Sequence, residues 1–365
     1  MLEKVYSRKS KGGTIVGRGS GSVDSVPTML APGEEVIRTS SANLFRPLLK
    51  DINNNAGGVN NEAMNVHLSH RCGIFDLGNK TILNVRGINI YSKLQSLFTN
   101  NIYNIGQNKT METLLLNEDG FVIDKPTIVR SSNDFSIMCG RENADIITDY
   151  LTDNSSVSVE NTDKDFDLFA FQGSWHKAGM NKMYYFLKLN FKEVLETEKT
   201  CVKQGDITLF SKNIAGSNGF VVSIPKTETE ELFNKLLHQP NLYMSGSEAL
   251  KVNKMESRMI IDEYLNGKYT PFELNQMSLI RNTDDISYTK FNSGNKKIMS
   301  ITFENYNTTK KPSKIMNKEK QKIGKLIDVV YSPYLHKFKG YCEIYDYQEK
   351  FGIYDNKQIE LMNVH

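Results

Sequence analysis

The sequence contains few cysteines, and their spacing excludes the common cysteine-based sites. Only four occur among 365 residues: Cys72, Cys139, Cys201 and Cys342. No two of them form a CxxC pair, so neither a disulfide scaffold nor a cysteine-rich zinc site is indicated. His67 and His70 precede Cys72, but a fourth ligand at a recognisable spacing is missing, so no metal site is predicted. We expect the four thiols to be reduced.

The sequence also lacks a long apolar run and an excess of one charge. No stretch approaches the roughly 18 consecutive apolar residues of a membrane-spanning helix. Lys and Arg number 45 against 42 Asp and Glu, which gives a net charge of +3. This balance indicates neither a nucleic acid nor a membrane as partner. The chain is predicted to be a soluble globular protein of two or three domains, at roughly 150 residues per domain.

Glycine and serine are concentrated at the N-terminus. Because this composition leaves little to bury, residues 1–27 are expected to form a flexible segment. The segment is also basic and rich in Ser, as mitochondrial transit peptides are, although it has no clear amphipathic helix. The expected location is therefore the mitochondrial matrix, with the cytoplasm as the alternative.

Hydrophobic periodicity predicts an α+β fold for the rest of the chain. Strands are expected at residues 80–85, 113–116, 121–123, 134–138 and 167–171, with two more around the loop 213–219. Helices are expected at residues 87–97, 143–151 and 229–238. Short strands near the C-terminus indicate a small β domain. The predicted division is an α/β region of two subdomains at residues 28–285 and a β domain at residues 286–365.

Several longer stretches follow one another in a characteristic order. They are HLSHRCGIFD at residues 67–76, TLLLNEDGFVID at 113–124, FAFQG at 169–173, GFVVSIP at 219–225 and TPFE at 270–273. No single stretch is decisive, but their order resembles that of the glycine cleavage T-protein (aminomethyltransferase) family. The resemblance extends over roughly residues 45–345.

The resemblance implies a fold, a reaction, a cofactor and a partner. The fold would be a T-protein-like ring of two α/β folate-binding subdomains and a C-terminal β-barrel domain. The reaction would transfer a one-carbon unit from an aminomethyl group on a lipoyl carrier protein (H-protein) to tetrahydrofolate. Neither a nucleic acid nor a membrane is implied as a partner. In such a site, the protein orients the attacking nitrogen and stabilises developing positive charge with a carboxylate.

The catalytic acid of the family is displaced in this chain. The family motif VIDD has its folate-facing Asp at the second acidic position, where this sequence has Lys125. Asp124 remains, but neighbouring strand residues point to opposite faces. Asp124 therefore replaces the missing acid only if a β-bulge redirects it, and the following Pro126 makes such an irregularity possible.

Positions that contact the pterin in the family are also changed. Val221 stands where the family has a Glu that pairs with the pterin donors, and Gly140 stands where it has a pterin-facing Asn. An unpaired buried donor costs about 1–3 kcal/mol, so each lost contact would weaken folate binding roughly tenfold to a hundredfold. Gly216 and Gly219 of the family loop are kept.

In the helix that the resemblance places near the folate tail, a leading Arg is missing, whereas Lys254 and Glu256 remain. The sequence thus keeps folding landmarks and changes ligand contacts. Two hypotheses follow: a divergent tetrahydrofolate-dependent aminomethyltransferase, or a catalytically degenerate scaffold or binding protein with a disabled folate pocket. A third, a demethylase or iron–sulfur assembly factor of the same fold, ranks last because the KGCYxGQE signature of the assembly factors is absent.

Overall fold

The structure is a computed structural model. It describes residues 7–8, 28–29, 71–131, 134–153, 156–174, 176–187, 201–236, 239, 242–281, 294–304, 314–345, 349–354 and 357–365. Two short strands, β1 (Ser7–Arg8) and β2 (Thr28–Met29), pair in parallel. The predicted boundary at residues 285–286, as well as His67 and His70, lies outside the described residues, so these predictions stay open.

The first subdomain is a sheet with helices on its outer side. Its strands are β4 (Lys80–Gly87), β5 (Lys109–Glu112), β8 (Thr127–Arg130), β9 (Phe135–Gly140) and β10 (Val157–Asn161), in the order β10-β4-β9-β8-β5. Helices α3 (Ile90–Leu97) and α4 (Ala144–Thr152) pack on it through Leu94, Ile147 and Leu151. Short 3₁₀ turns η2 (Ile102–Asn104), η3 (Arg141–Asn143) and η4 (Thr162–Lys164) connect these elements.

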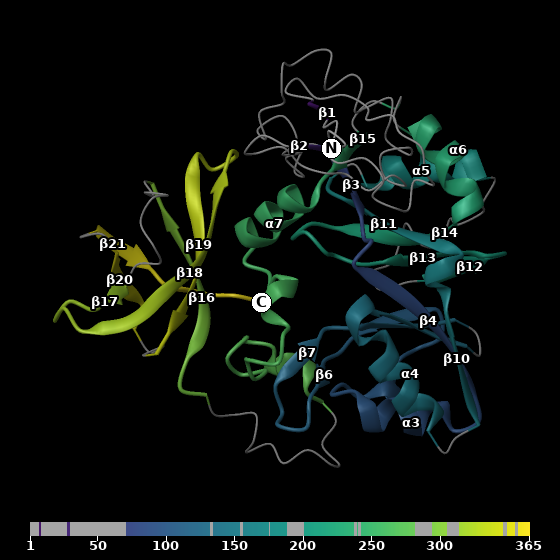
Figure 1. Ribbon diagram of the computed structural model, residues 1–365, viewed down its shortest axis with the longest axis horizontal. Helices are drawn as coiled ribbons and strands as arrows, with labels where there is room; N and C mark the ends of the chain where they lie inside the picture. Colours follow the sequence, from purple (N-terminus) through teal and green to yellow (C-terminus); the bar gives the residue numbers. More distant parts are fainter. Residues whose placement is uncertain are drawn as a thin grey trace, which may run out of the picture.

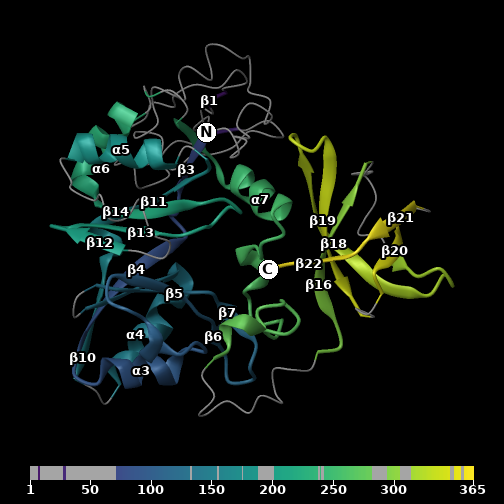
Figure 2. The ribbon, with the colours of Figure 1, turned by 180° about the vertical axis from the view of Figure 1, so that it is seen from behind.

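The second subdomain repeats this plan. Its strands are β3 (Cys72–Asp76), β11 (Phe166–Gln172), β12 (Cys201–Gln204), β13 (Ile207–Ser211), β14 (Gly219–Pro225) and β15 (Leu242–Ser245), in the order β12-β13-β14-β11-β3-β15. Helices α5 (His176–Leu187) and α6 (Lys226–Leu236) cover its outer face, where Leu232, Phe233 and Leu236 are buried. Figures 1 and 2 show the two sheets stacked between the pair α5 and α6 and the pair α3 and α4.

A third apolar cluster fills the space between the two sheets. Residues alternate along β14, so Phe220 and Val222 face α6 whereas Val221 faces the other sheet. Val221 packs there in one cluster with Met138 and Val129 of the first subdomain. Both faces of β14 are therefore buried, which explains its nearly continuous apolar sequence.

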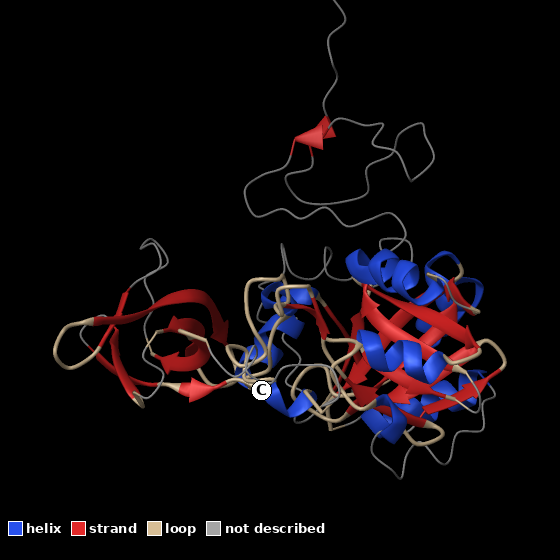
Figure 3. Ribbon diagram, turned by 90° about the horizontal axis from the view of Figure 1, so that it is seen from below, coloured by secondary structure: helices blue, strands red, loops and turns tan. Residues whose placement is uncertain are grey.

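The C-terminal domain is a sheet of seven strands. They are β16 (Lys297–Phe303), β17 (Lys314–Met316), β18 (Lys322–Ser332), β19 (Lys337–Ile344), β20 (Phe351–Tyr354), β21 (Lys357–Glu360) and β22 (Met362–Asn363). The sheet curls so that β16 also contacts β21, which is not its neighbour in the strand order. Figure 3 shows this strand-rich domain beside the helix-covered sheets. The arrangement of two helix-covered sheets and a separate strand-rich domain is the α+β architecture that the sequence predicts.

A segment of short helices and turns lies between these parts. It contains α7 (Ser247–Glu256), η6 (Asp262–Tyr264) and η7 (Met277–Leu279), and the short hairpin of β6 (Leu115–Leu116) and β7 (Val122–Asp124) packs against it. Helix α7 contacts β3 on one side and β18 and β19 on the other. The backbone N–H of Ile260 donates to the C=O of His365, so the end of the described chain returns to this segment.

Most predicted elements occur close to their predicted bounds, with α3 as an instructive exception. The predicted helix at residues 87–97 begins only at Ile90, because Gly87 has φ 148° and Asn89 has φ 61°, which are not helical values. The four cysteines are free, as the sequence predicts, and all four are buried. None of the described helices is long and apolar enough to span a membrane.

Candidate functional site

The strand β7 contains the irregularity on which the role of Asp124 depends. Leu115 pairs with Asp124, whereas the next residue of β6, Leu116, pairs with Val122, so Ile123 is an extra residue in the ladder. Such a bulge changes the direction of the side chain that follows it. Here it separates Asp124 from Lys125: the carboxylate turns toward the ends of β4 and β9, and the ammonium turns toward β5.

Asp124 is held firmly at these strand ends. Its side chain is 2% exposed. The backbone N–H of Gly140 donates to Oδ2 at 2.6 Å, the N–H of Lys125 donates to Oδ1 at 2.7 Å, and Nζ of Lys80 lies 3.8 Å from Oδ1. Burial raises the pKa of Asp124 above its ordinary value, although Lys80 and the two N–H donors oppose this rise. The result is a fixed carboxyl group in a dry environment.

Lys80 also belongs to a second set of ion pairs that reaches the connecting segment. Its Nζ lies 3.2 Å from Oδ2 of Asp262, and Nζ of Lys254 on α7 lies 3.0 Å from Oδ1 of the same residue. Lys80 and Lys254 outweigh burial and lower the pKa of Asp262 far below its ordinary range. One carboxylate therefore bridges the first sheet and α7.

A third set of ion pairs joins the two sheets. Glu112 on β5 places Oε1 at 2.6 Å from Nζ of Lys212, which follows β13, and Oε2 at 3.3 Å from Nζ of Lys125. The amide of buried Gln172 positions Lys212, because it donates to the C=O of Lys212 and accepts from the N–H of Ile214. We call the seven residues of these three sets the charged cluster: Lys80, Glu112, Asp124, Lys125, Lys212, Lys254 and Asp262.

The pairing of Glu112 predicts a specific dependence of stability on pH. Burial opposes ionisation, but Lys212 and Lys125 outweigh it and lower the pKa of Glu112 to about 2. A depressed pKa in the folded state contributes stability that is present above the ordinary value of 4.5 and is lost as the pH falls toward 2. Glu112→Gln is therefore expected to reduce the free energy of unfolding by about 1 kcal/mol at pH 6, a value lowered for solvent screening.

Urea unfolding at several pH values measures this difference, which should shrink steadily between pH 4.5 and pH 2. The matched control is Glu231→Gln, because Glu231 pairs with Lys235 on the exposed surface of α6. A difference between wild type and Glu112→Gln that does not change with pH would contradict the assigned ion pairs.

The predicted folate contact at Val221 is buried in the apolar cluster between the sheets. Its side chain is fully buried there, beside Phe210, Ala170 and Met138. It offers no hydrogen-bond acceptor to the amino and ring N–H groups of a pterin. The residues present thus do not fit a pterin ring held in the way that the sequence resemblance implies, and we derive no reaction step through the folate.

Two further predicted contacts, Gly140 and Gly219, lie where other atoms of the chain approach closely. The N–H of Gly140 is already used by Asp124. A Cβ atom on Gly219 would lie 2.2 Å from the C=O oxygen of Phe171 and 2.3 Å from Nε2 of Gln172. Both glycines therefore have structural roles here, and their predicted roles in binding a cofactor stay predictions.

Gly216 fixes the loop against the end of α7. Its φ is 80°, and a Cβ atom there would lie 1.6 Å from Oγ of Ser257. Asn213 Oδ1 accepts from the N–H of Ala215 and of Gly216, so the turn keeps its shape without the acidic residue of the family loop.

Gly216→Ala is expected to lower the free energy of unfolding by about 1–3 kcal/mol, because it adds both a steric overlap and an unfavourable φ. Adding Ser257→Gly should recover only the steric part. Chemical denaturation of the two single variants and the double variant measures this coupling. Strict additivity of the two changes would contradict the contact.

Glu256, another predicted contact, points away from the charged cluster. Its carboxylate accepts a hydrogen bond from the hydroxyl of Ser332 at 2.5 Å, at the end of β18. Burial raises the pKa of Glu256, while Ser332 and the charge of Lys339 oppose this rise. In the described structure, Glu256 therefore joins α7 to the C-terminal domain, whereas its neighbour Lys254 belongs to the charged cluster.

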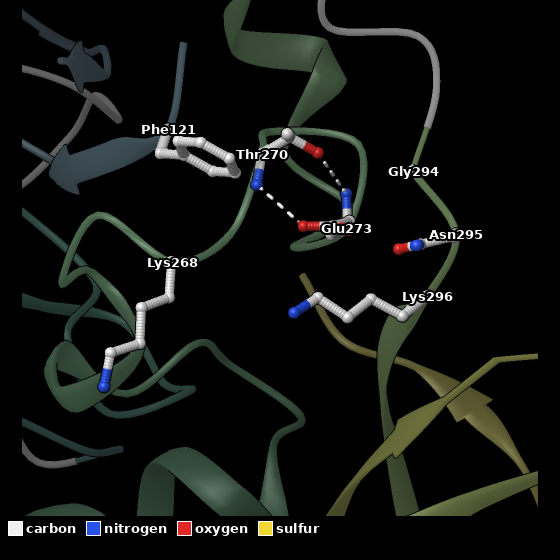
Figure 4. Close-up of a pocket in the computed structure, with 7 residues that line it drawn as sticks. All are labelled: Phe121, Lys268, Thr270, Glu273, Gly294, Asn295 and Lys296. Atoms are coloured by element: carbon white, nitrogen blue, oxygen red, sulfur yellow. Dashed lines mark hydrogen bonds between the residues drawn. The ribbon is translucent and has the colours of Figure 1, made fainter. Parts of the chain in front are cut away.

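A polar cleft of about 650 Å³ lies elsewhere, between the connecting segment and the start of β16. Figure 4 shows Glu273 and Thr270 in reciprocal hydrogen bonds on its wall, with Lys268 and Lys296 nearby. This is the geometry of a capping box, so the TPFE stretch has a structural explanation. None of the residues that line the cleft belongs to the charged cluster.

Sequence reasoning identified some members of the charged cluster and missed others. It singled out Asp124, Lys125 and Lys254, which the structure brings together, but it assigned no role to Glu112, Lys212 or Asp262. Two of their ion pairs, Glu112 with Lys212 and Asp262 with Lys80, connect residues 100 or more positions apart in the sequence. No group of three or more His, Cys, Asp or Glu side chains within the described part of the chain is arranged to hold a metal ion.

Comparisons with known proteins agree with this architecture. An aminomethyltransferase from Prochlorococcus marinus is 25% identical over 292 residues, which cover 72% of this chain and 77% of that protein. An aminomethyltransferase from Thermoanaerobacter pseudethanolicus is 21% identical over 209 residues, which cover 55% of this chain and 57% of that protein. The crystal structure of glycine cleavage system aminomethyltransferase T from Bartonella henselae matches with a TM-score of 0.69 at 16% identity, covering 83% of this chain and 87% of that one.

The match to the Bartonella henselae structure shows that the two chains share a fold. A family model described as the GCVT N-terminal domain matches residues 29–283, which is more than half of the chain. The protein therefore belongs to the GCVT, or glycine cleavage T-protein, family.

Proposed function

We propose that this chain is a divergent aminomethyltransferase. It receives an aminomethyl group from a lipoyl carrier protein and passes the one-carbon unit to tetrahydrofolate. The observation that carries the proposal is the bulge at Ile123, which turns the carboxyl group of Asp124 inward although the acid of the family motif is replaced by Lys125. Relatives named aminomethyltransferase support the reaction class.

The proposed role of Asp124 is electrostatic. When the bond between sulfur and the methylene carbon breaks, positive charge develops on the aminomethyl nitrogen and the electron pair goes to the sulfur. A fixed carboxylate in a dry site stabilises such charge more than water does, because it needs no reorganisation. The Gly140 and Lys125 N–H groups donate hydrogen bonds to the carboxyl group of Asp124 and oppose the rise in its pKa that burial causes.

A second candidate function is a non-catalytic binding protein of the same fold. The burial of Val221 favours it, because the position that pairs with the pterin in the resemblance is here part of a closed apolar cluster. Such a protein would keep the contact with the lipoyl carrier protein and lose the affinity for folate.

One assay separates the two candidates. Purified full-length chain is mixed with aminomethylated lipoyl carrier protein and tetrahydrofolate, and the release of ammonia is measured together with the formation of methylenetetrahydrofolate. The proposal expects both products to form in equal amounts and to depend on the chain. Binding of the carrier protein without product formation would favour the second candidate. Absence of both carrier binding and product formation would contradict both candidate functions.

A further inference from the structure

The part of the charged cluster around Glu112 carries an excess of positive charge. Lys125 and Lys212 each pair with one oxygen of the Glu112 carboxylate, and neither forms another ion pair among the described residues. Two ammonium groups thus share a single carboxylate. The side chains of Lys125 and Lys212 are only 19% and 10% exposed, so water screens this excess poorly.

The surroundings of Lys125 do not relieve this excess. Burial lowers the pKa of Lys125, Glu112 opposes this effect, and the charges of Lys212 and Lys254 add to it. Lys254 thus lies close enough to act on Lys125, although its own carboxylate partner is Asp262. The geometric excess is therefore that of Lys125 and Lys212, which share the carboxylate of Glu112.

A buried hydroxyl group without a hydrogen-bond partner among the described residues lies across the β5–β8 ladder from Glu112. Thr127 pairs with Glu112 across the ladder of β5 and β8, and its side chain is on the same face as Val129, toward the space between the sheets. The residue is 1% exposed, and its Oγ1 has no hydrogen-bond partner among the described residues. Buried hydroxyl groups are rarely left unsatisfied.

We propose that Lys125 and Lys212 form a binding site for an oxyanion, the carboxylate or phosphate group of a small molecule. Nζ of Lys125 and Nζ of Lys212 lie 3.3 and 2.6 Å from the two oxygens of one carboxylate, so an oxyanion that takes the place of the Glu112 carboxylate contacts both ammonium groups. It neutralises their excess charge through charge-assisted hydrogen bonds. The site includes the ammonium group of Lys125, which stands where the family motif has its second acid. Binding of the oxyanion does not require the transfer reaction.

Calorimetric titration of the full-length chain with inorganic phosphate, at low ionic strength, tests the site. We expect saturable binding of one phosphate per chain. Lys125→Gln should weaken it about tenfold or more, since a hydrogen bond to a charged group contributes about 1.5–3 kcal/mol. Glu112→Gln should strengthen binding, because it removes the carboxylate that competes for both lysines. A general loss of structure cannot produce this opposite effect.

Matched variants complete the test. Lys125→Arg should keep most of the affinity, whereas Lys212→Gln should lower it as Lys125→Gln does. Lys268→Gln removes the same charge from the separate polar cleft and should leave binding unchanged. Absence of phosphate binding at millimolar concentration, or equal affinity in wild type, Lys125→Gln and Glu112→Gln, would overturn the proposal.

The same titration distinguishes two sources of the oxyanion. Competition by p-aminobenzoylglutamate, which carries the glutamyl carboxylates of folate without its pterin, would indicate a folate tail. Phosphate binding that p-aminobenzoylglutamate does not displace would indicate a separate small acid or phosphate ester. Since neither carrier protein nor tetrahydrofolate is present, failure of the proposed transferase activity does not affect this result.

Discussion

Asp124→Asn is expected to lower kcat for aminomethyl transfer by about a hundredfold or more, with a much smaller change in KM. The variant keeps the size of the side chain and removes its negative charge. Loss of one preorganised electrostatic group in an active site typically costs a factor of 10²–10³ in rate. An effect on kcat is expected because the positive charge develops only as the bond to sulfur breaks. Steady-state measurements with the aminomethylated carrier protein provide both constants.

The control for this prediction must separate the effect of the lost charge on the rate from the effect of the substitution on folding stability. The two oxygens of Asp124 each accept a hydrogen bond from a backbone N–H group, whereas Asn has only one side-chain oxygen. A loss of about 1–2 kcal/mol in the free energy of unfolding is therefore expected as well. Denaturant unfolding of Asp124→Asn therefore accompanies the kinetics. Asp134→Asn breaks an exposed pair with Arg86 and should leave the rate unchanged. A folded Asp124→Asn variant with the wild-type kcat would contradict the proposed role.

The sequence predicted the order of elements because hydrophobic periodicity is a local property. The strand that follows the loop 213–219 is encoded by neighbouring apolar residues, and it occurs as expected. The direction of the side chains after residue 122 is not encoded by a local pattern of this kind. Pro126 indicated that an irregularity was possible, but only the pairing of β6 with β7 shows that Ile123 is the extra residue.

The ion pairs of the charged cluster were not predictable from the sequence, for a different reason. Lys212 and Glu112 meet because two sheets stack at a particular rotation, which no local pattern encodes. Lys80 and Asp262 meet because the connecting segment folds back onto β4. A lysine at the end of a strand is ordinarily a solvated residue, so Lys80 and Lys212 carried no signal that separated them from surface lysines.

Val221→Glu, which restores the residue type of the family, is expected to destabilise the fold by about 3–5 kcal/mol. The new carboxylate would lie among Phe210, Ala170 and Met138, where no cation or hydrogen-bond donor is positioned for it among the described residues. An uncompensated buried charge has a cost of this size. Denaturant unfolding near neutral pH measures the loss, and Val202→Glu on the edge strand β12, where the side chain is only half-buried, should cost much less.

Val221→Gln separates the charge of the new side chain from its size. A carboxyl group buried without a partner has a raised pKa in the folded state, so the folded protein with Val221→Glu is favoured below the ordinary pKa of Glu and loses stability as the pH rises. The stability difference between Val221→Glu and Val221→Gln should therefore disappear in acid and grow toward neutral pH. If Val221→Glu instead unfolds like wild type and gains affinity for tetrahydrofolate, the space between the sheets opens to admit a pterin, and the packing of Val221 would no longer account for the altered site.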